Sequence, residues 1–372
     1  MTLATTSPGP EAAYLNHAGT SWPKPKSVRS AVAAALDRAP TDWAAAFEAQ
    51  HGRLGRAFGL GHEHRLLLTP GCTSALAIAI QDLPWRAGDV VALSAFEHVA
   101  VERPCAGLGR LGVESQVLPS SRESMIDLAA TERLLAHRPV RLLVVSAAAN
   151  TTGDLLPVAE LGALARRYDA RLLVDAAQVA GWMSLADYLP HADMMAFGAH
   201  KGMQGVWGIG GLVLREELAM ATPRLNGGLA KPGWCDGGSV DRLALSAWVA
   251  ALDWLDAPAQ ADRLDRARTL SARLQWRLQG LEGVKVLARH PPEARLPTVA
   301  MALDDARRLV QIRSRLAKAG IVHGAGLQCA PLAHQHLGTA EQGTLRFSFG
   351  PSSRDEDLDR LLSVLDRAST DT

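Results

Sequence analysis

The chain has 372 residues, of which 48% are hydrophobic and 21% are charged, and its 39 basic and 38 acidic side chains nearly cancel. This composition predicts a globular protein of two domains or one large one, without the charged surface that would favour nucleic acid or a membrane. No apolar run reaches the roughly 18 residues of a membrane-spanning helix, and the N-terminus lacks the pattern of a secretory signal. The four cysteines lie far apart and show no metal-site spacing, so we expect a cytoplasmic protein with free thiols.

The first part of the chain predicts alternating strands and helices. Residues 1–13 are expected to form a loose tail, and the turn-rich segment after them is interrupted by Pro23 and Pro25. A turn at Pro70–Ser74 opens a helix of small residues, and this context suits anion binding at a helix N-terminus. The glycine-spaced stretch 52–61 is assigned no element. Strands are predicted at Arg65–Thr69, Val90–Ser94, Gly112–Leu118 and Arg141–Ser146, and helices at Ser27–Leu36, Ala75–Ile80, from about Val99, Ile126–Ala136 and Val158–Tyr168.

The central stretch, residues 171–211, adds two apolar strands that end close to polar groups. Asp175 follows the first strand, and His200 and Lys201 follow the second, at the start of a glycine-rich loop. Strands separated by helices of about 10–15 residues imply a mainly parallel sheet with both faces covered. The acid and the lysine would then meet at the carboxyl edge, where open α/β folds bind ligands.

Beyond Leu214 the pattern changes to a smaller α+β domain. We predict three parts: an N-terminal segment 1–25 that contributes to the active site, a large domain 26–242 and a small C-terminal domain 243–372. The expected elements of the last part are helices at Leu243–Leu255, Arg263–Leu278, Ala306–Ala319 and Asp355–Leu365, and strands near Val284–Leu287, Thr298–Leu303 and Thr344–Ser348.

Lys201 is the candidate with the clearest chemistry. An isolated lysine is usually a surface residue, but one among glycines at a sheet edge can be desolvated, which lowers its pKa and makes it nucleophilic toward an aldehyde. The aldehyde that needs such an amine is pyridoxal phosphate, whose ring nitrogen also needs an acid. Asp175 could supply that acid, although the position also suits a helix N-cap. Gln178 could donate to the phenolic oxygen, or be an ordinary polar surface residue.

The same cofactor needs a phosphate cradle and a flat group against its ring. Cys72 and Thr73 offer backbone amides and a hydroxyl at a predicted helix N-terminus, although such turns are frequent. His98 follows a strand and could lie over the ring, while a lone histidine is more often structural. Asn150 follows the strand at Arg141–Ser146 and could contact the ring oxygen or the substrate.

Taken in order, these motifs resemble the class V aminotransferase family of fold-type I pyridoxal-phosphate enzymes, most closely its cysteine desulfurase and selenocysteine lyase branch. The resemblance covers roughly residues 14–365. It implies an α/β fold with a large, mainly parallel sheet domain that binds the cofactor, a smaller α+β C-terminal domain, and a homodimer. The segments that carry it are YLNHAGTSWPKP, TPGCTSALAIAI, EHVAVE, AAANTTGDLLP, VDAAQVAG, AFGAHKG and LQCAPLAHQHLGTAEQGTLRFSFGPSS.

The resemblance also implies residue roles. Lys201 would bind the cofactor covalently and act as general base, and His98 would stack on the ring. The remaining contacts would be Asp175 to the ring nitrogen, Gln178 to the phenolic oxygen, Asn150 beside the ring, and Cys72, Thr73, His200 and Ser239 at the phosphate. The chain departs from the family at Gly198, where a serine or threonine hydroxyl usually meets the phosphate, and in its short loop 227–241.

Cys329 and Arg346 determine the expected reaction. A free cysteine is usually a buried small hydrophobe, but Cys329 lies in an expected glycine loop, and the resemblance implies that it takes sulfur from bound L-cysteine as a persulfide. Arg346 would clamp the substrate carboxylate with its planar fork, or else form a surface pair with Glu341 or Asp355. We expect a cysteine desulfurase that releases L-alanine and passes sulfur to an acceptor protein.

Three alternatives stay open. The shortened loop motivates a selenocysteine lyase or a dedicated C–S lyase on the same scaffold. A class V aminotransferase would transfer an amino group to a keto acid, and Cys329 would then have no chemical role. A subunit that binds the cofactor without turnover is disfavoured by the joint presence of Lys201, Asp175, Cys329 and Arg346.

Overall fold

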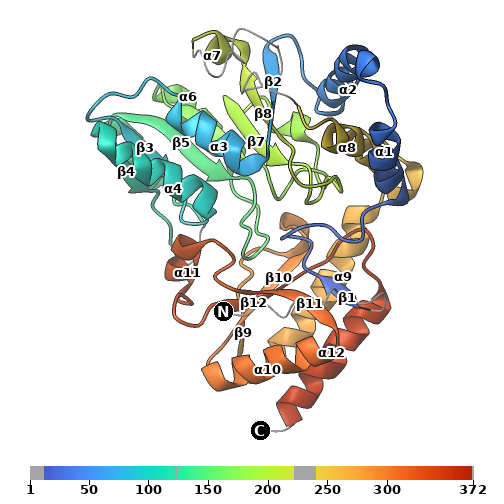
Figure 1. Cartoon of the computed structure of the whole chain (residues 1–372). Helices are drawn as coiled ribbons and strands as arrows, with labels where there is room; N and C mark the ends of the chain where they lie inside the picture. Colours follow the sequence, from blue (N-terminus) through green and yellow to red (C-terminus); the bar gives the residue numbers. More distant parts are fainter. Residues whose placement is uncertain (1–11, 122–124, 222–239, 371–372) are drawn as a thin grey trace.

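The computed structural model describes residues 12–121, 125–221 and 240–370, and it contains two β-sheets, one above the other in Figure 1. The larger sheet has seven strands in the order β2-β8-β7-β6-β5-β3-β4. Strands β3 to β7 run parallel, and only β8 is antiparallel to its neighbours β7 and β2. The strands are β2 (His64–Thr69), β3 (Val90–Leu93), β4 (Glu114–Val117), β5 (Val140–Ser146), β6 (Arg171–Asp175), β7 (Met194–Gly198) and β8 (Gly210–Arg215). The predicted large, mainly parallel sheet is confirmed.

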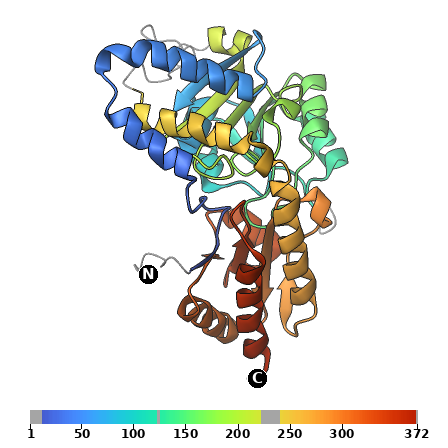
Figure 2. The same ribbon diagram turned by 90° about the vertical axis from the view of Figure 1, so that its right-hand side faces the viewer.

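Both faces of this sheet are covered, because successive side chains of a strand point to opposite faces. In β5, Leu143 and Val145 join one core, while Leu142 and Val144 join the other. The first core is completed by α2 (Trp43–Ala57), α5 (Leu128–His137), α6 (Val158–Arg167) and α8 (Arg242–Leu255). The second is completed by α3 (Cys72–Gln81), α4 (Val99–Gly107) and α7 (Glu216–Ala221). Figure 1 and Figure 2 show these helices on either side of the strands.

Helix α8 packs with the large sheet. It lies along α1 (Lys26–Leu36) and also contacts α2. Its buried Trp248 and Leu252 belong to the core of the large sheet. The division into domains stays a prediction, but this packing favours a boundary after α8 rather than at residue 243.

The smaller sheet has the order β1-β11-β12-β10-β9. Its strand β1 (Ala13–Leu15) comes from the N-terminal segment and pairs in parallel with β11 (Ile321–Gly326). Asn16 then bridges to Ser348 at the end of β12 (Thr344–Ser348), which carries the N-terminal segment to the junction of the two sheets. The other elements are β9 (Val284–Val286), β10 (Thr298–Leu303), α9 (Arg263–Gln279), α10 (Ala306–Lys318), α11 (Pro331–Leu337) and α12 (Asp355–Thr370).

Helices α7 and α11 were not predicted, and α2 and α3 also differ from the prediction. Helix α2 contains Gly52 and Gly55, which belong to the glycine-spaced stretch 52–61 for which we predicted no element. A glycine costs a helix about 1 kcal/mol relative to alanine, and the packing of α2 against α8 outweighs this cost. Helix α3 begins at Cys72, within the predicted turn, rather than at Ala75. Within the described residues no helix, α2 included, is long and apolar enough to cross a membrane.

Strand β11 explains glycines that we had expected to form a loop. Gly324 pairs with Arg346 on β12, and a β-carbon at position 324 would approach the Arg346 Nε to 3.0 Å. The glycine therefore lets the strand pass close to the guanidinium group. The sequence pattern missed both strands of the β1–β11 pair. Strand β11 contains two glycines and β1 has only three residues, so neither shows a clear alternation of apolar residues.

Candidate active site

A cavity of about 460 Å³ opens at the carboxyl edge of the large sheet. Ser146 and Asp175, the last residues of β5 and β6, line it, as does Lys201 just past β7. Most of the predicted site residues meet here, namely Cys72, Thr73, His98, Asn150, Asp175, Gln178, His200, Lys201 and Cys329. Ser239 lies outside the described residues. The edge of the sheet thus gathers groups from distant parts of the chain, as open α/β folds do.

Lys201 and Asp175 form the charged part of the cavity. Burial lowers the pKa of the Lys201 amine, and the negative charge of Asp175 partly opposes this shift. Asp175 is buried, and its Oδ1 accepts hydrogen bonds from the Ala177 N–H at 2.8 Å and from the Cys72 thiol at 3.6 Å. Burial, and then the charge of Asp175, raise the pKa of the Cys72 thiol. An amine that is easily neutral beside a fixed carboxylate suits covalent chemistry with an aldehyde.

His98 supplies a flat ring, and Asn150 an amide oxygen that has no partner among the described residues. The His98 Nδ1 accepts a hydrogen bond from the Ala100 N–H at 3.0 Å, which leaves Nε2 available. Burial and the charge of Lys201 lower the pKa of His98, so the ring is neutral. The Asn150 Nδ2 donates to the Gln328 carbonyl at 2.8 Å, while its Oδ1 is buried without a partner in the described protein. These groups and the buried acid and amine fit a planar cofactor with a ring nitrogen and an aldehyde.

The other end of the cavity fits the phosphate of such a cofactor. The α3 N-terminus with Thr73 and the ring of His200 line it. Burial and the charges of Lys201 and Lys24 lower the pKa of His200 to about 4. A β-carbon at Gly198 would lie 3.6 Å from the Cys72 β-carbon, an ordinary contact, so the backbone there does not itself require a glycine. Trp207 also lines the cavity.

Arg346 is buried on β12, beside the cavity lining. Its Nη1 donates to the Asn150 carbonyl at 2.7 Å and its Nη2 to the Asn16 Oδ1 at 3.1 Å, while Nε is buried without a partner in the described protein. Burial lowers its pKa to about 10. The alternative of a surface pair with Glu341 or Asp355 is wrong, because the side chain is only 4% exposed.

Cys329 is an exposed free cysteine that lines the cavity, not a buried small hydrophobe. It lies in a short turn between β11 and α11, because the glycines before it belong to the strand. Gln328 and Cys329 both adopt left-handed backbone conformations, with φ of 41° and 57°. Such a conformation costs a non-glycine residue roughly 1–2 kcal/mol, so the turn needs other interactions to hold it.

Gln328 supplies those interactions, and the sequence pattern did not reveal it. Its Oε1 accepts from the Thr344 hydroxyl at 3.0 Å and lies 3.0 Å from Nε2 of the buried His334. Its Nε2 donates to the Thr344 carbonyl at 3.2 Å. The Cys329 carbonyl accepts from the Val99 N–H at 2.8 Å, next to His98. The turn is thereby fixed to β12 of the small sheet and to the start of α4.

Glu97 is a second residue that the sequence pattern did not reveal. It is fully buried behind Ser146, and it accepts hydrogen bonds from the Ser146 N–H at 2.7 Å, the Ser146 hydroxyl at 2.8 Å and the Ser94 hydroxyl. Burial raises the pKa of Glu97 to about 8. No basic side chain compensates its charge among these contacts, so ionisation is costly.

We expect the replacement Glu97→Gln to change how stability depends on pH. The folded state keeps the Glu97 proton up to a pKa of about 8, whereas the unfolded state releases it near the ordinary glutamate pKa of 4.5. The stabilising contribution of Glu97 to the wild-type free energy of unfolding should therefore be fully present at low pH. Between pH 4.5 and about 8 it should fall by about 1.4 kcal/mol per pH unit relative to the variant. Urea unfolding at pH 5.5, 7 and 8.5 measures the difference. Parallel profiles for the two proteins would contradict the assignment.

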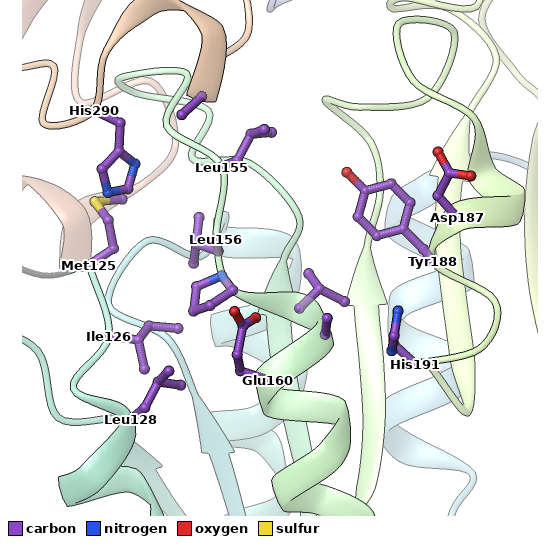
Figure 3. A pocket seen from close by; sticks show the side chains of 14 residues that line it. Met125, Ile126, Leu128, Leu155, Leu156, Glu160, Asp187, Tyr188, His191 and His290 are labelled. Atoms are coloured by element: carbon purple, nitrogen blue, oxygen red, sulfur yellow. The ribbon is translucent and has the colours of Figure 1, made fainter.

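A second hollow, of about 580 Å³, lies at the start of α6 and contains none of the predicted site residues. Figure 3 shows Met125 and His290 on one side of it and Asp187, Tyr188 and His191 on the other. Its floor is mainly apolar, and within the described residues no group of His, Cys, Asp or Glu there could hold a metal ion. The chemistry-bearing groups are in the first cavity.

Comparison with known proteins agrees with this geometry. The sequence model of the family "Aminotransferase class-V" matches residues 26–361. A probable cysteine desulfurase of Pseudomonas aeruginosa is 31% identical over 385 aligned positions, which cover 95% of this chain and 93% of that protein. The apo structure of a cysteine desulfurase from Thermococcus onnurineus superposes with a TM-score of 0.87 at 23% identity, covering 97% and 96% of the two chains. The Escherichia coli cysteine desulfurase CsdA superposes with a TM-score of 0.83 at 23% identity, covering 96% and 94%. These two structures share the fold.

Proposed function

The chain belongs to the aminotransferase class-V family, and from this premise we propose that it is a pyridoxal-phosphate-dependent cysteine desulfurase, which converts L-cysteine to L-alanine and a persulfide on Cys329. The observation that carries the proposal is that Cys329 and Lys201 line one cavity, together with the buried Asp175. An aminotransferase would need no thiol there. The name of the Pseudomonas aeruginosa relative supports the same substrate.

The cofactor would be held by the groups already described: Lys201 covalently, Asp175 at the ring nitrogen, Gln178 at the phenolic oxygen, His98 against the ring, Asn150 beside it, and the α3 N-terminus with Cys72, Thr73 and His200 at the phosphate. When bound, pyridoxal phosphate stabilises the negative charge that develops on the substrate Cα. Lys201 then removes the Cα proton as general base, which its lowered pKa favours.

Arg346 and Cys329 act on the substrate. Arg346 binds the substrate carboxylate through its guanidinium group, whose two outer nitrogens are already oriented by Asn150 and Asn16. The Cys329 thiolate bonds to the substrate sulfur while the carbon–sulfur bond breaks, and protonation of the carbon yields alanine. The neutral His98 accepts at Nδ1 from the Ala100 N–H, so its proton is on Nε2, from which it can donate a hydrogen bond to the substrate.

We propose a cytoplasmic homodimer that delivers sulfur to a separate acceptor protein. A persulfide-forming thiol requires a reducing compartment, and the three cysteines in the described residues, Cys72, Cys105 and Cys329, are free. The exposure of Cys329, and of Leu327 beside it at 38%, supports access by an acceptor. Ser239 stays a candidate phosphate contact of the dimer.

The direct test is to purify the protein, record the absorbance of its cofactor, add L-cysteine, and quantify alanine, sulfide and a mass increase of one sulfur on the Cys329 peptide. Stoichiometric persulfide and continued alanine release in the presence of a thiol would support the proposal. Alanine formation from selenocysteine alone would favour a selenocysteine lyase. The absence of alanine from both substrates would reject the function.

We expect Gln328→Ala to slow persulfide formation about tenfold, because losing its hydrogen bonds, worth about 1 kcal/mol each, lets the strained turn relax. The absorbance change on cysteine addition should stay at the wild-type rate, since substrate binding does not use this side chain. Stopped-flow absorbance and quenched mass measurements separate the two steps. Gln335→Ala, on the exposed side of α11, is the matched control. Equal rates for the two variants would reject this role of Gln328.

A further inference from the structure

Lys24 is a partly buried cation that has no acidic partner among the described residues. It lies between Pro23 and Pro25, which restrict the backbone around it. Burial lowers its pKa to about 8, and within the described residues no carboxylate forms an ion pair with it. A desolvated ammonium group is costly unless a negative charge or strong dipoles compensate it.

The contacts of Lys24 converge on one backbone carbonyl. Its Nζ donates to the His200 carbonyl at 2.9 Å and to the Ser21 hydroxyl at 2.6 Å. The same carbonyl accepts from the Ser21 N–H at 2.9 Å, the Ser21 hydroxyl at 3.0 Å and the Thr20 hydroxyl at 3.1 Å. The N-terminal segment thereby holds the peptide that precedes Lys201.

Lys24 also contacts the wall of the active-site cavity at its phosphate end. Its Nζ lies 5.2 Å from the centre of the Trp207 ring, and the His200 ring stacks on Trp207 with centroids 6.4 Å apart. Trp207 and His200 both line the cavity next to the α3 N-terminus. Lys24 itself therefore stands directly behind two residues of the lining.

We propose that Lys24 is a positioning residue that supplies the fixed positive charge for the cofactor phosphate, acting through His200 and Trp207. This inference rests on the proposed cofactor. It accounts for two observations together: the ammonium has no acidic partner in the described part of the chain, and position 198 has no hydroxyl although a β-carbon there would make only ordinary contacts. Burial and the charges of Lys201 and Lys24 together lower the pKa of His200, and its Nδ1 lies 3.1 Å from the Thr20 hydroxyl oxygen.

The test uses the apo-protein and two ligands that lack the aldehyde, pyridoxine 5′-phosphate and pyridoxine, so that Lys201 chemistry does not contribute. Titration calorimetry should show that Lys24→Gln weakens the phosphate ester about tenfold and leaves pyridoxine unchanged, because an electrostatic interaction across a protein interior distinguishes charged from neutral ligands. Lys24→Arg should retain affinity within about threefold, since it keeps the charge.

Lys26→Gln is the matched control, because this lysine is exposed at the first position of α1. Thermal unfolding of each apo-protein verifies that the variants are folded. If Lys24→Gln binds the phosphate ester as tightly as wild type, or weakens both ligands equally, the inference is overturned while the proposed function stands. If wild type binds neither ligand, the cofactor assignment itself fails.

Discussion

Replacing Lys201 with alanine is expected to reduce turnover by at least about 10⁴-fold, because one amine both holds the cofactor and moves the Cα proton, and general base catalysis alone contributes up to about 10⁴. The reason lies in its surroundings: Lys201 lines the cavity beside Asp175, and burial lowers its pKa. The His200 carbonyl next to it is fixed by hydrogen bonds from the N-terminal segment. No other lysine of the described residues lines this cavity.

Borohydride reduction followed by peptide mass analysis measures the first role of Lys201 independently of activity. Wild type should carry one cofactor on the peptide that contains Lys201, and the variant should carry none, while its unfolding midpoint stays close to that of the wild-type apo-protein. Lys318→Ala, an exposed position at the end of α10, should change neither result. Residual turnover above about 1% of wild type would contradict the assignment.

Replacing Cys329 with serine is expected to abolish persulfide and to slow alanine release about 10³-fold, because a serine hydroxyl is not ionised near neutral pH and is a poor nucleophile toward sulfur. Cofactor absorbance and its change on adding cysteine should persist, since Arg346, Asn150 and Lys201 are untouched. Rapid-mixing absorbance and an alanine assay measure the two outcomes on one sample.

Cys105→Ala is the control for general thiol effects. Cys105 is a buried residue of α4 and does not line the cavity, so this change should lower the free energy of unfolding by about 1 kcal/mol and leave the rate per folded enzyme unchanged. If Cys329→Ser released alanine or sulfide at the wild-type rate, sulfur would leave without the thiol. A C–S lyase on this scaffold would then replace the proposed desulfurase.

The sequence best predicted the helices and strands that are determined by interactions between residues close together in the chain. The strands at Leu172–Val174 and Met194–Phe197 are short apolar runs with a polar end, and the structure has strands there, buried on both faces as parallel strands require. Helix α2 was missed because its two glycines lower local helix propensity, and the contact with α8 that compensates lies nearly 200 residues away. Strand β11 was missed because its glycines are untypical of a strand. What favours glycine at position 324 is the close approach of the Arg346 side chain, which the sequence does not reveal.

The candidate site shows the same division. Lys201, Asp175 and Cys329 could be selected from the sequence because their residue types carry chemistry, and the family motifs singled them out. Gln328, Glu97 and Lys24 could not, because glutamine, glutamate and lysine are common and acquire a role only from their surroundings. Glu97 is unusual because it is buried against Ser146, and Lys24 because its contacts come from a segment 176 residues away in the chain.

The sequence by itself therefore determined the layered α/β plan, the family and the reactive groups, because hydrophobic periodicity and short motifs are local properties of the chain. Only the tertiary structure decided that α8 packs with the large sheet, that Arg346 is a buried group oriented by Asn150 and Asn16, and that the Cys329 turn is fixed by Gln328. The burial and the electrostatic environment of a side chain depend on which segments, distant in the sequence, the fold brings into contact. The lowered pKa values of Lys201 and Lys24 and the raised pKa of Glu97 follow from these tertiary contacts.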